Sequence, residues 1–213
     1  MIYELAVVAE ATIGDDKVAS LNEMVSSVVA EFQGEILIQD DWGSRRMAQA
    51  AADGKDRARY LYFIYRAETA CNQEMDRRLR INESVLKQLF VKLGEESETD
   101  KIVKRYRTPF SKKYNGSVTQ SDEDSDDDME EAMGQEGERR KFSRRKACWF
   151  TSKGITADWK DPATFNWLIN EFGKISPARV SGISVKHQRY ATSAIKRARQ
   201  LGIVSYMSNR IAE

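Results

Sequence analysis

An acidic run in the middle of the chain does most to limit how this sequence can fold. The 24 residues from 115 to 138 carry ten Asp and Glu and no Lys or Arg. Such a segment cannot bury enough apolar surface to offset the entropy lost when its backbone is ordered. We therefore predict a disordered acidic linker, which as a flexible coil would span roughly 25–30 Å. It would separate two folding units.

The segments on either side of this linker differ in charge. Residues 1–114 have a net charge of −1 and the linker has −10, whereas residues 139–213 hold 16 basic and four acidic residues, a net charge of +12. The net charge of +1 for the whole chain is therefore a cancellation between segments of opposite sign. This asymmetry predicts an acidic tether joined to a nucleic-acid-binding unit in the last third of the chain.

The first unit alternates between strand-like and helix-like patterns. Apolar, β-branched stretches predict strands, and apolar residues that recur every three or four positions predict helices. In chain order we predict a strand at 2–8, a helix that begins at Asp15 or Asp16 and is ended by Gly34, a strand at 35–41 that continues beyond Gly43, a turn at 51–56, a strand at 59–67, a helix at 70–80 and a strand at 85–93. The order βαββαβ indicates an α+β, ferredoxin-like domain over residues 1–94.

The third predicted strand is apolar on both faces. One face carries Leu61, Phe63 and Tyr65, and the other carries Tyr60, Tyr62 and Ile64. A sheet with helices on one side needs only one apolar face, so the second face needs a cover. That cover is another protein, RNA or a later part of the same chain. The alternative is a few tolerated surface tyrosines.

Beyond the first unit we expect an extended tail and then a small helical domain. Residues 95–114 are polar and are expected to leave the domain, so that tail and linker together occupy 95–138. Residues 139–213 are predicted to form a basic, all-α helical domain. Its first helix is capped by Asp161, has Pro162 in its first turn and ends at Gly173; a loop at 177–182 leads to a second helix at 184–201. The predicted apolar stripes are Phe165, Leu168, Ile169 and Phe172 in the first helix, and Tyr190, Ala194, Ile195 and Ala198 in the second.

Cations are concentrated in two places in this last unit. The stretch RRKFSRRK at 139–146 places six cations within eight residues, and Trp149 and Phe150 follow shortly after it. The second predicted helix carries further cations with almost no acids beside them. Phosphates are the natural counterpart, because each neutralised phosphate releases counterions. A solvated tail, a localisation signal or a salt-bridged surface helix are the alternatives.

Catalytic and metal-binding patterns are absent from the sequence. The single histidine, His187, has no carboxylate near it in sequence, and there is no phosphate-binding loop, GxGxxG or GxSxG motif. The acidic run offers Asp122, Asp124 and Asp126 at the spacing of a calcium loop, but Asp127 and Met133 stand where that loop needs Gly and Glu. We therefore expect no enzyme activity, no metal and no cofactor.

The cellular compartment is predicted from the cysteines and the N-terminus. Cys71 and Cys148 have no CxxC spacing, which is typical of a reducing compartment rather than of a disulfide framework. The first 14 residues lack a basic start and carry Glu4 and Glu10 within an apolar stretch, so we expect neither a signal peptide nor a membrane span. The expected location is the cytoplasm or the equivalent compartment of an organelle.

Four stretches of the last unit form a specific pattern. They are RRKACWF (144–150), DWKD (158–161), GKISPARVSG (173–182) and KHQRYATSAIKRARQLG (186–202). With them, residues 141 to about 206 resemble bacterial small-subunit ribosomal protein eighteen. The sequence departs from that family at Ala178, where an arginine is usual, and at Val204-Ser205, where Leu-Pro is usual. One phosphate contact expected of the family therefore lacks its side chain here.

The first unit carries a second resemblance. Tyr3-Glu4, DWGSRRMA (41–48) and LRINESVLKQLFVKL (79–93) are similar to small-subunit ribosomal protein six, with Gln49-Ala50 in place of the family's Tyr-Pro. The two families form a heterodimer that binds the central domain, or platform, of small-subunit ribosomal RNA beside protein fifteen. The resemblance implies a fused, tethered version of that pair. A tether makes the encounter intramolecular, at an effective concentration on the order of millimolar.

These resemblances imply partners and site residues. The partners are small-subunit ribosomal RNA, neighbouring proteins such as protein fifteen, and the other half of the same chain; no membrane is expected. The alternative is an RNA-binding regulator outside the ribosome, for instance of its own message. The residues expected to contact RNA are Arg144, Arg145, Lys146, Arg179, Lys186, Arg189, Lys196, Arg197 and Arg199, with Arg45, Arg46 and Arg80 as lesser contacts. The interface between the halves is expected to include Tyr60, Tyr62, Ile64 and Tyr206.

Overall fold

The N-terminal part of the chain forms a four-stranded antiparallel sheet. In this computed structural model, which describes residues 1–50, 54, 56–106, 108–109 and 148–207, the strands are β1 (Ile2–Glu10), β2 (Glu35–Arg46), β3 (Arg57–Arg66) and β4 (Val85–Gly94). Their order in the sheet is β2-β3-β1-β4. That order, with one helix after β1 and one after β3, is the split βαβ arrangement, so the ferredoxin-like prediction is confirmed. The acidic linker and most of the turn predicted at 51–56 lie outside the described residues.

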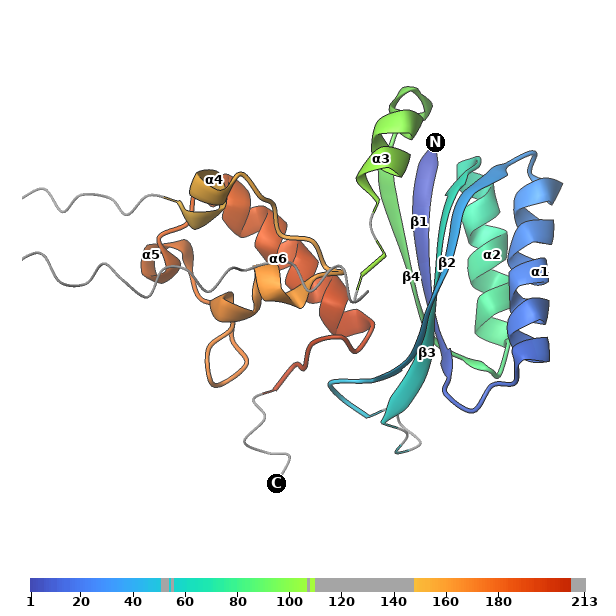
Figure 1. The fold of residues 1–213 in the computed structure, drawn as a ribbon, viewed down its shortest axis with the longest axis horizontal. Helices are drawn as coiled ribbons and strands as arrows, with labels where there is room; N and C mark the ends of the chain where they lie inside the picture. Colours follow the sequence, from blue (N-terminus) through green and yellow to red (C-terminus); the bar gives the residue numbers. More distant parts are fainter. Residues whose placement is uncertain (51–53, 55, 107, 110–147, 208–213) are drawn as a thin grey trace, which may run out of the picture.

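Both helices of this domain pack on the same face of the sheet. They are α1 (Asp15–Glu31) and α2 (Thr69–Ile81), and Figure 1 shows them side by side on one side of the strands. The ends of α1 differ in detail from the prediction. Gly14 is the N-cap, and Asp15 and Asp16 lie in the first turn, where their charge complements the helix dipole. At the other end Gln33, with φ 52°, takes the left-handed conformation.

Gly34 has a different role from the predicted helix stop. A Cβ at this position would lie 2.5 Å from the carbonyl oxygen of Arg66 and 2.8 Å from a methyl group of Val29. Only glycine lets the start of β2 approach the end of β3 this closely. β2 then continues to Arg46, as predicted, through a register shift between Asp41 and Gly43.

The segment after β4 folds back onto the domain, so the prediction of an extended tail is wrong for residues 95–106. A 3-10 turn, η1 (Glu96–Glu98), leads into helix α3 (Thr99–Arg105). The ring of Tyr106 stacks on that of Tyr62, with centroids 5.1 Å apart and planes inclined by 9°. Its hydroxyl donates to Asp40 Oδ2 over 2.6 Å and accepts from Trp42 Nε1 over 3.2 Å. These long-range partners hold a segment whose own sequence is polar.

The C-terminal domain is held together by one long helix and several short turns. They are α4 (Trp149–Lys153), the 3-10 turns η2 (Pro162–Thr164) and η3 (Asn166–Leu168), α5 (Ala178–Ser181) in the segment predicted to be a loop, and α6 (Val185–Gln200). The helix predicted from Pro162 to Phe172 is wrong. Asp161 does cap its first turn, accepting from the Ala163 amide. However, the Asn170 side chain accepts from the amides of Phe172 and Lys174, which replaces helical hydrogen bonds with a turn.

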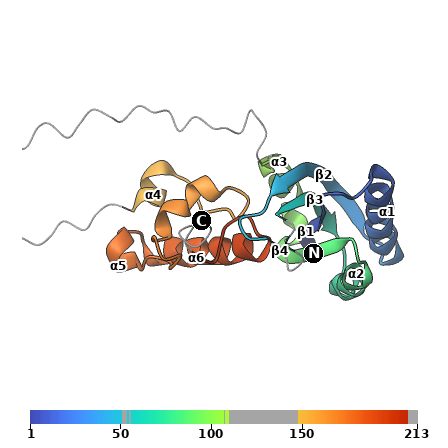
Figure 2. The same ribbon diagram turned by 90° about the horizontal axis from the view of Figure 1, so that it is seen from below.

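Two hydrophobic cores lie on opposite faces of the sheet. One is enclosed by α1 and α2 and contains Leu5, Phe63 and Met75 among its fully buried side chains. The other lies between the opposite face and the C-terminal domain, and it joins Tyr62 to Trp159. The two views in Figures 1 and 2 agree that the C-terminal domain covers the face that α1 and α2 leave open. The sheet is thus the middle layer of the described structure.

Candidate nucleic-acid interface

Helix α6 separates a buried face from a cationic one. Ala191, Ala194, Ile195 and Ala198 are buried at helical spacing. The side chains on the opposite face follow the same 3.6-residue period, so they form one continuous strip along the helix. Its members are Lys186, Arg189, Tyr190, Lys196 and Arg197, which we call the α6 basic face. Lys186, Arg189 and Lys196 are exposed, and Arg197 is half-buried.

The cations of the α6 basic face have no acidic partner in the described part of the chain. The helix contains no Asp or Glu, and no ion pair joins any of these four cations to another described residue. Lys186 also lies in the first turn, where the helix dipole disfavours a positive charge, unlike Arg197 in the last turn. An uncompensated strip of this kind creates a positive potential that attracts an external anion.

Tyr190 belongs to this face and not to the buried stripe in which the sequence placed it. Its side chain is 47% exposed, and Ala191 takes the buried position instead. The result is an accessible aromatic ring between Lys186 and Arg197.

Arg199 uses its guanidinium within the protein, although the sequence assigned it to RNA. Its Nε donates to the Ser205 carbonyl oxygen over 3.2 Å, and one terminal nitrogen donates to the carbonyl oxygen of Gly173. The group also lies 5.6 Å from the ring centre of Tyr206. Arg199 therefore ties the end of the domain to the 169–175 turn.

The remaining predicted RNA contacts are dispersed. Arg179 is exposed on α5, and Arg45 and Arg46 lie at the end of β2. Arg80 lies on α2, on the other side of the sheet, and its Nε is 2.7 Å from Asp76 Oδ2. The structure therefore does not bring Arg80 together with the α6 basic face. Arg144, Arg145 and Lys146 lie outside the described residues.

A buried carboxylate joins the two domains. Glu4 on β1 is 2% exposed. Its Oε1 accepts from Trp159 Nε1 over 2.7 Å, and its Oε2 accepts from the Tyr62 hydroxyl over 2.7 Å and from Lys160 Nζ over 3.1 Å. Lys160 also lies 3.2 Å from Asp158. Desolvation alone would lower the pKa of Lys160, but the negative charges of Glu4 and Asp158 raise it, so the ammonium stays charged.

Further hydrogen bonds extend this interface along the sheet. The Tyr60 hydroxyl donates to the Leu201 carbonyl over 2.9 Å, and the Ala48 amide donates to the Gly202 carbonyl over 2.7 Å. Of the four residues predicted for the interface, Tyr60, Tyr62 and Ile64 are buried in the shared core. Tyr206 is 52% exposed and contacts Arg199 of its own domain.

Sequence reasoning missed Glu4 and Lys160 as interface residues. A signal was available for Glu4, because it is the one charged residue in the first eight positions of an otherwise apolar strand. Strand alternation places it on the same face as Ala6 and Val8, which line the shared core. A charge at such a position needs a partner from whatever covers that face.

A thiol–imidazole pair lies at the start of the C-terminal domain. Cys148 Sγ is 3.2 Å from His187 Nδ1, which is also 3.0 Å from the Ser184 hydroxyl. Desolvation acts to raise the pKa of Cys148, but hydrogen bonds from Thr151, Ser184 and His187 outweigh it and lower the pKa to about 6. The described residues contain no group of three or more His, Cys, Asp or Glu that could hold a metal ion. None of the described helices is long and apolar enough to cross a membrane.

Comparisons with known proteins match two separate parts of the chain to ribosomal families. A family model described as ribosomal protein S6 matches residues 2–92, and one described as ribosomal protein S18 matches residues 153–204. Among curated relatives, small ribosomal subunit protein bS18 of Geotalea daltonii is 46% identical over 76 residues, which are 35% of this chain and 84% of that protein. The bS18 protein of Pelobacter propionicus is 50% identical over 72 residues, 33% of this chain and 77% of that protein.

A solved structure is also similar to the N-terminal half. It is the crystal structure of 30S ribosomal protein S6 from Thermotoga maritima, with 17% identity and a TM-score of 0.43 over 49% of this chain and 97% of that one.

Proposed function

The chain belongs to the family of small ribosomal subunit protein bS18 through its C-terminal part, and from this premise we propose that its two halves act as a tethered heterodimer on the platform of the small subunit. The matches to ribosomal proteins S6 and S18 in one chain support a structural, non-enzymatic role in the small ribosomal subunit.

The α6 basic face is the observation that supports binding of this chain to the central domain of small-subunit ribosomal RNA. Lys186, Arg189, Lys196 and Arg197 lie along one side of a rigid helix without acidic partners in the described residues. Phosphates are the anions that such a strip fits, because a helix fixes the spacing of its cations. Tyr190 adds a flat ring on which an unpaired base can stack.

The buried Glu4 supports the proposal that the halves work as one unit. The hydrogen bonds from Trp159 and Lys160 reach it from the C-terminal domain, and the aromatic core around Tyr62 is shared by both domains. Separation would expose that core and leave a carboxylate without two of its donors. Pairing the domains before RNA binding would hold the α6 basic face in one orientation relative to the sheet, with less entropy to lose on binding.

The proposed partners follow from the same premise. They are small-subunit ribosomal RNA, neighbouring small-subunit proteins such as protein fifteen, and the other half of the same chain. The proposed location is the ribosome of the cytoplasm or of an equivalent organellar compartment. In this proposal the first domain extends past residue 94, to Tyr106, because α3 and Tyr106 pack on the sheet.

The salt dependence of RNA binding tests the α6 basic face. The variant Lys186→Gln, Lys196→Gln, Arg197→Gln should reduce the slope of log affinity against log salt by about two to three units on a central-domain RNA fragment. A matched control replaces Lys17, Arg77 and Lys92, which lie on the helix side of the sheet, with Gln. It should leave the slope nearly unchanged. Equal slopes for both triple variants and the parent would contradict the assignment.

Sedimentation tests the ribosomal role separately. The chain should travel with the small subunit after a moderate-salt wash, at one copy per particle. A chain found mainly free, but still bound to RNA, would instead support a regulator outside the ribosome.

A further inference from the structure

A groove opens where the end of the β2–β3 hairpin meets the C-terminal domain. It has a volume of about 380 Å³, and Arg45, Arg46 and Arg57 of the hairpin line it together with Pro162 and Ile203. Figure 1 shows this end of the hairpin curving toward the C-terminal domain. Neither domain forms the groove alone, because its walls come from both.

The hydrogen bonds described above hold the two walls of this groove together. The Tyr60 hydroxyl and the Ala48 amide, on the hairpin side, donate to consecutive carbonyls of the turn at Leu201 and Gly202, directly before Ile203. Gly202, with φ 73°, gives this turn its shape. The position of Ile203 relative to the arginines is therefore fixed by docking of the domains.

Two of the three arginines that line the groove are placed so that their charges repel. Arg46 and Arg57 are direct partners across the β2–β3 ladder, a position in which like charges repel. Among the described ion pairs, Arg46 is joined to Asp56 over 3.7 Å, and both of these side chains are largely exposed. No ion pair joins Arg57 to another described residue. A bound anion would relieve the repulsion.

From these observations we propose that this groove binds a phosphodiester of the RNA backbone and that Arg57 contacts the phosphate. The complete site exists only when the two domains are docked. The inference rests on the proposed function, which supplies the RNA, and it extends the RNA-binding surface from α6 onto the first domain. RNA binding and domain docking then favour each other, because the same phosphate contacts a wall from each domain. Arginine suits this task because its planar group presents several donors to phosphate oxygens.

The test uses the full chain and a central-domain RNA fragment. Arg57→Gln should lower the salt slope by about 0.7 to 0.9 units, and Arg57→Lys should keep the parent slope. Lys17→Gln, on α1, removes one charge far from the groove and should leave the slope unchanged. Thermal melts of each variant confirm that it is folded.

A rescue variant tests whether the groove is shared by both domains. In Arg57→Gln, Ile203→Lys the new ammonium stands on the opposite wall, and its long stem keeps apolar contacts while the charge reaches the groove. The parent slope should return. A slope unchanged by Arg57→Gln, or a double variant that stays at the Arg57→Gln value, would overturn the proposal.

Two further outcomes separate this inference from its premise and from a small-anion site. Absence of RNA binding by the parent chain would overturn the proposed function, and the inference with it, whereas parent binding with no response to Arg57 removes only the inference. When the ionic strength is held constant, added inorganic phosphate should not displace the RNA. Displacement in the parent, but not in Arg57→Gln, would assign the groove to a free phosphate instead.

Discussion

The two faces of the sheet are closed in different ways. The face toward α1 and α2 packs apolar side chains such as Leu5, Phe63 and Met75 against helices that follow their strands directly. The other face is aromatic, holds the carboxylate of Glu4, and is covered by a domain whose first described helix begins more than 50 residues after the end of β4. Short connections bring α1 and α2 to their face of the sheet. The C-terminal domain is far away in sequence, so it has to recognise its face through specific contacts.

The difference shows where specificity is needed. Apolar packing is tolerant, because side chains of similar volume replace each other at low cost. A buried carboxylate is not tolerant, because it is destabilising unless matching donors arrive with the cover. Glu4 with Trp159 and Lys160 therefore selects one cover for the open face, whereas the helix face needs no such selection.

The largest expected effect comes from removing a buried aromatic on either face. Phe63→Ala and Trp159→Ala should each cost about 3–5 kcal/mol. Phe63→Ala should destabilise the first domain as a whole. Trp159→Ala should release the C-terminal domain while the sheet amides stay protected from hydrogen exchange. Equal loss of protection on β1 in both variants would remove the distinction between the two faces.

A smaller effect is expected from the ion pair of the interface. Lys160→Met alone leaves Glu4 buried without its counter-charge and should weaken docking by about 3 kcal/mol. Adding Glu4→Gln removes the unpaired charge, so the double variant should recover most of that loss. The measurement is a double-mutant cycle on denaturant unfolding of the full chain. Losses that simply add would show that the pair contributes nothing to specificity.

The two cysteines, one in each domain, are expected to differ in reactivity. Hydrogen bonds, led by that with Thr151, lower the pKa of Cys148 to about 6 against desolvation. Cys71 lies on α2 with its side chain fully buried, and this burial raises its pKa. Alkylation of Cys148 should rise with pH through about 6 and level off by neutrality, because the thiolate is the nucleophile. Cys71 should react only after unfolding. Mass spectrometry after timed alkylation of the parent and of Cys148→Ser distinguishes them.

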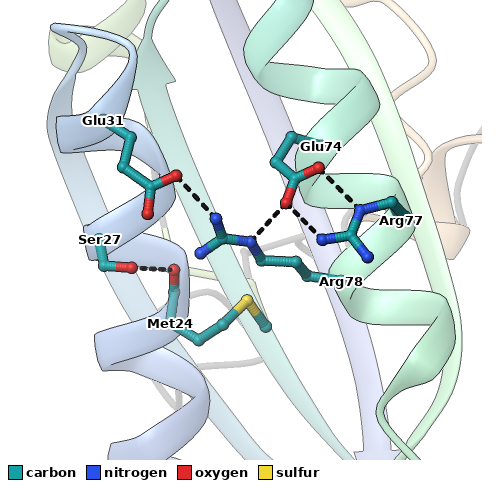
Figure 3. Close-up of polar contacts among 6 residues, drawn as sticks. All are labelled: Met24, Ser27, Glu31, Glu74, Arg77 and Arg78. Atoms are coloured by element: carbon teal, nitrogen blue, oxygen red, sulfur yellow. Dashed lines mark hydrogen bonds and ion pairs between the residues drawn. The ribbon is translucent and has the colours of Figure 1, made fainter.

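The smallest expected effect lies on the outer surface of the helix layer. Figure 3 shows Arg78 between Glu31 of α1 and Glu74 of α2, with Arg77 on the same carboxylate. Hydrogen bonds from Arg77 and then Arg78 lower the pKa of Glu74 to about 2. Because the pKa of Glu74 is lowered from its usual value of 4.5, its ionised form stabilises the folded protein at pH values above 4.5. This contribution is lost as the pH falls toward 2.

Because that network lies at the surface and is partly exposed, Arg78→Gln should shift the thermal midpoint only slightly at neutral pH. The shift should disappear in high salt and at pH 2. A large shift that survives high salt would mean that this surface, too, selects its neighbours.

The sequence predicted the sheet well, because strands alternate with period two and the helices that cover it have strong apolar stripes. Alternation in β3 also indicated that a second face needed a cover. Prediction failed where distant side chains decide local structure. Tyr106 is held by Tyr62 and Asp40, and the helix expected at Pro162–Phe172 is replaced by a turn around Asn170.

The candidate site was predicted unevenly for the same reason. The cations of α6 follow from helical periodicity, but Arg199 is diverted by the carbonyls of Gly173 and Ser205, which only the folded chain brings to it. The role proposed for Arg57 depends on its cross-strand partner and on Ile203 in the other domain. Neither relation is visible in local sequence.

A density map of the small subunit isolated with this chain tests the central claim most directly. The account predicts one chain in both positions, with Trp159 against Glu4 beneath the sheet and the α6 basic face toward the backbone of the central-domain RNA. Density for the two halves at separate sites, or a sheet face covered by a different protein, would contradict it.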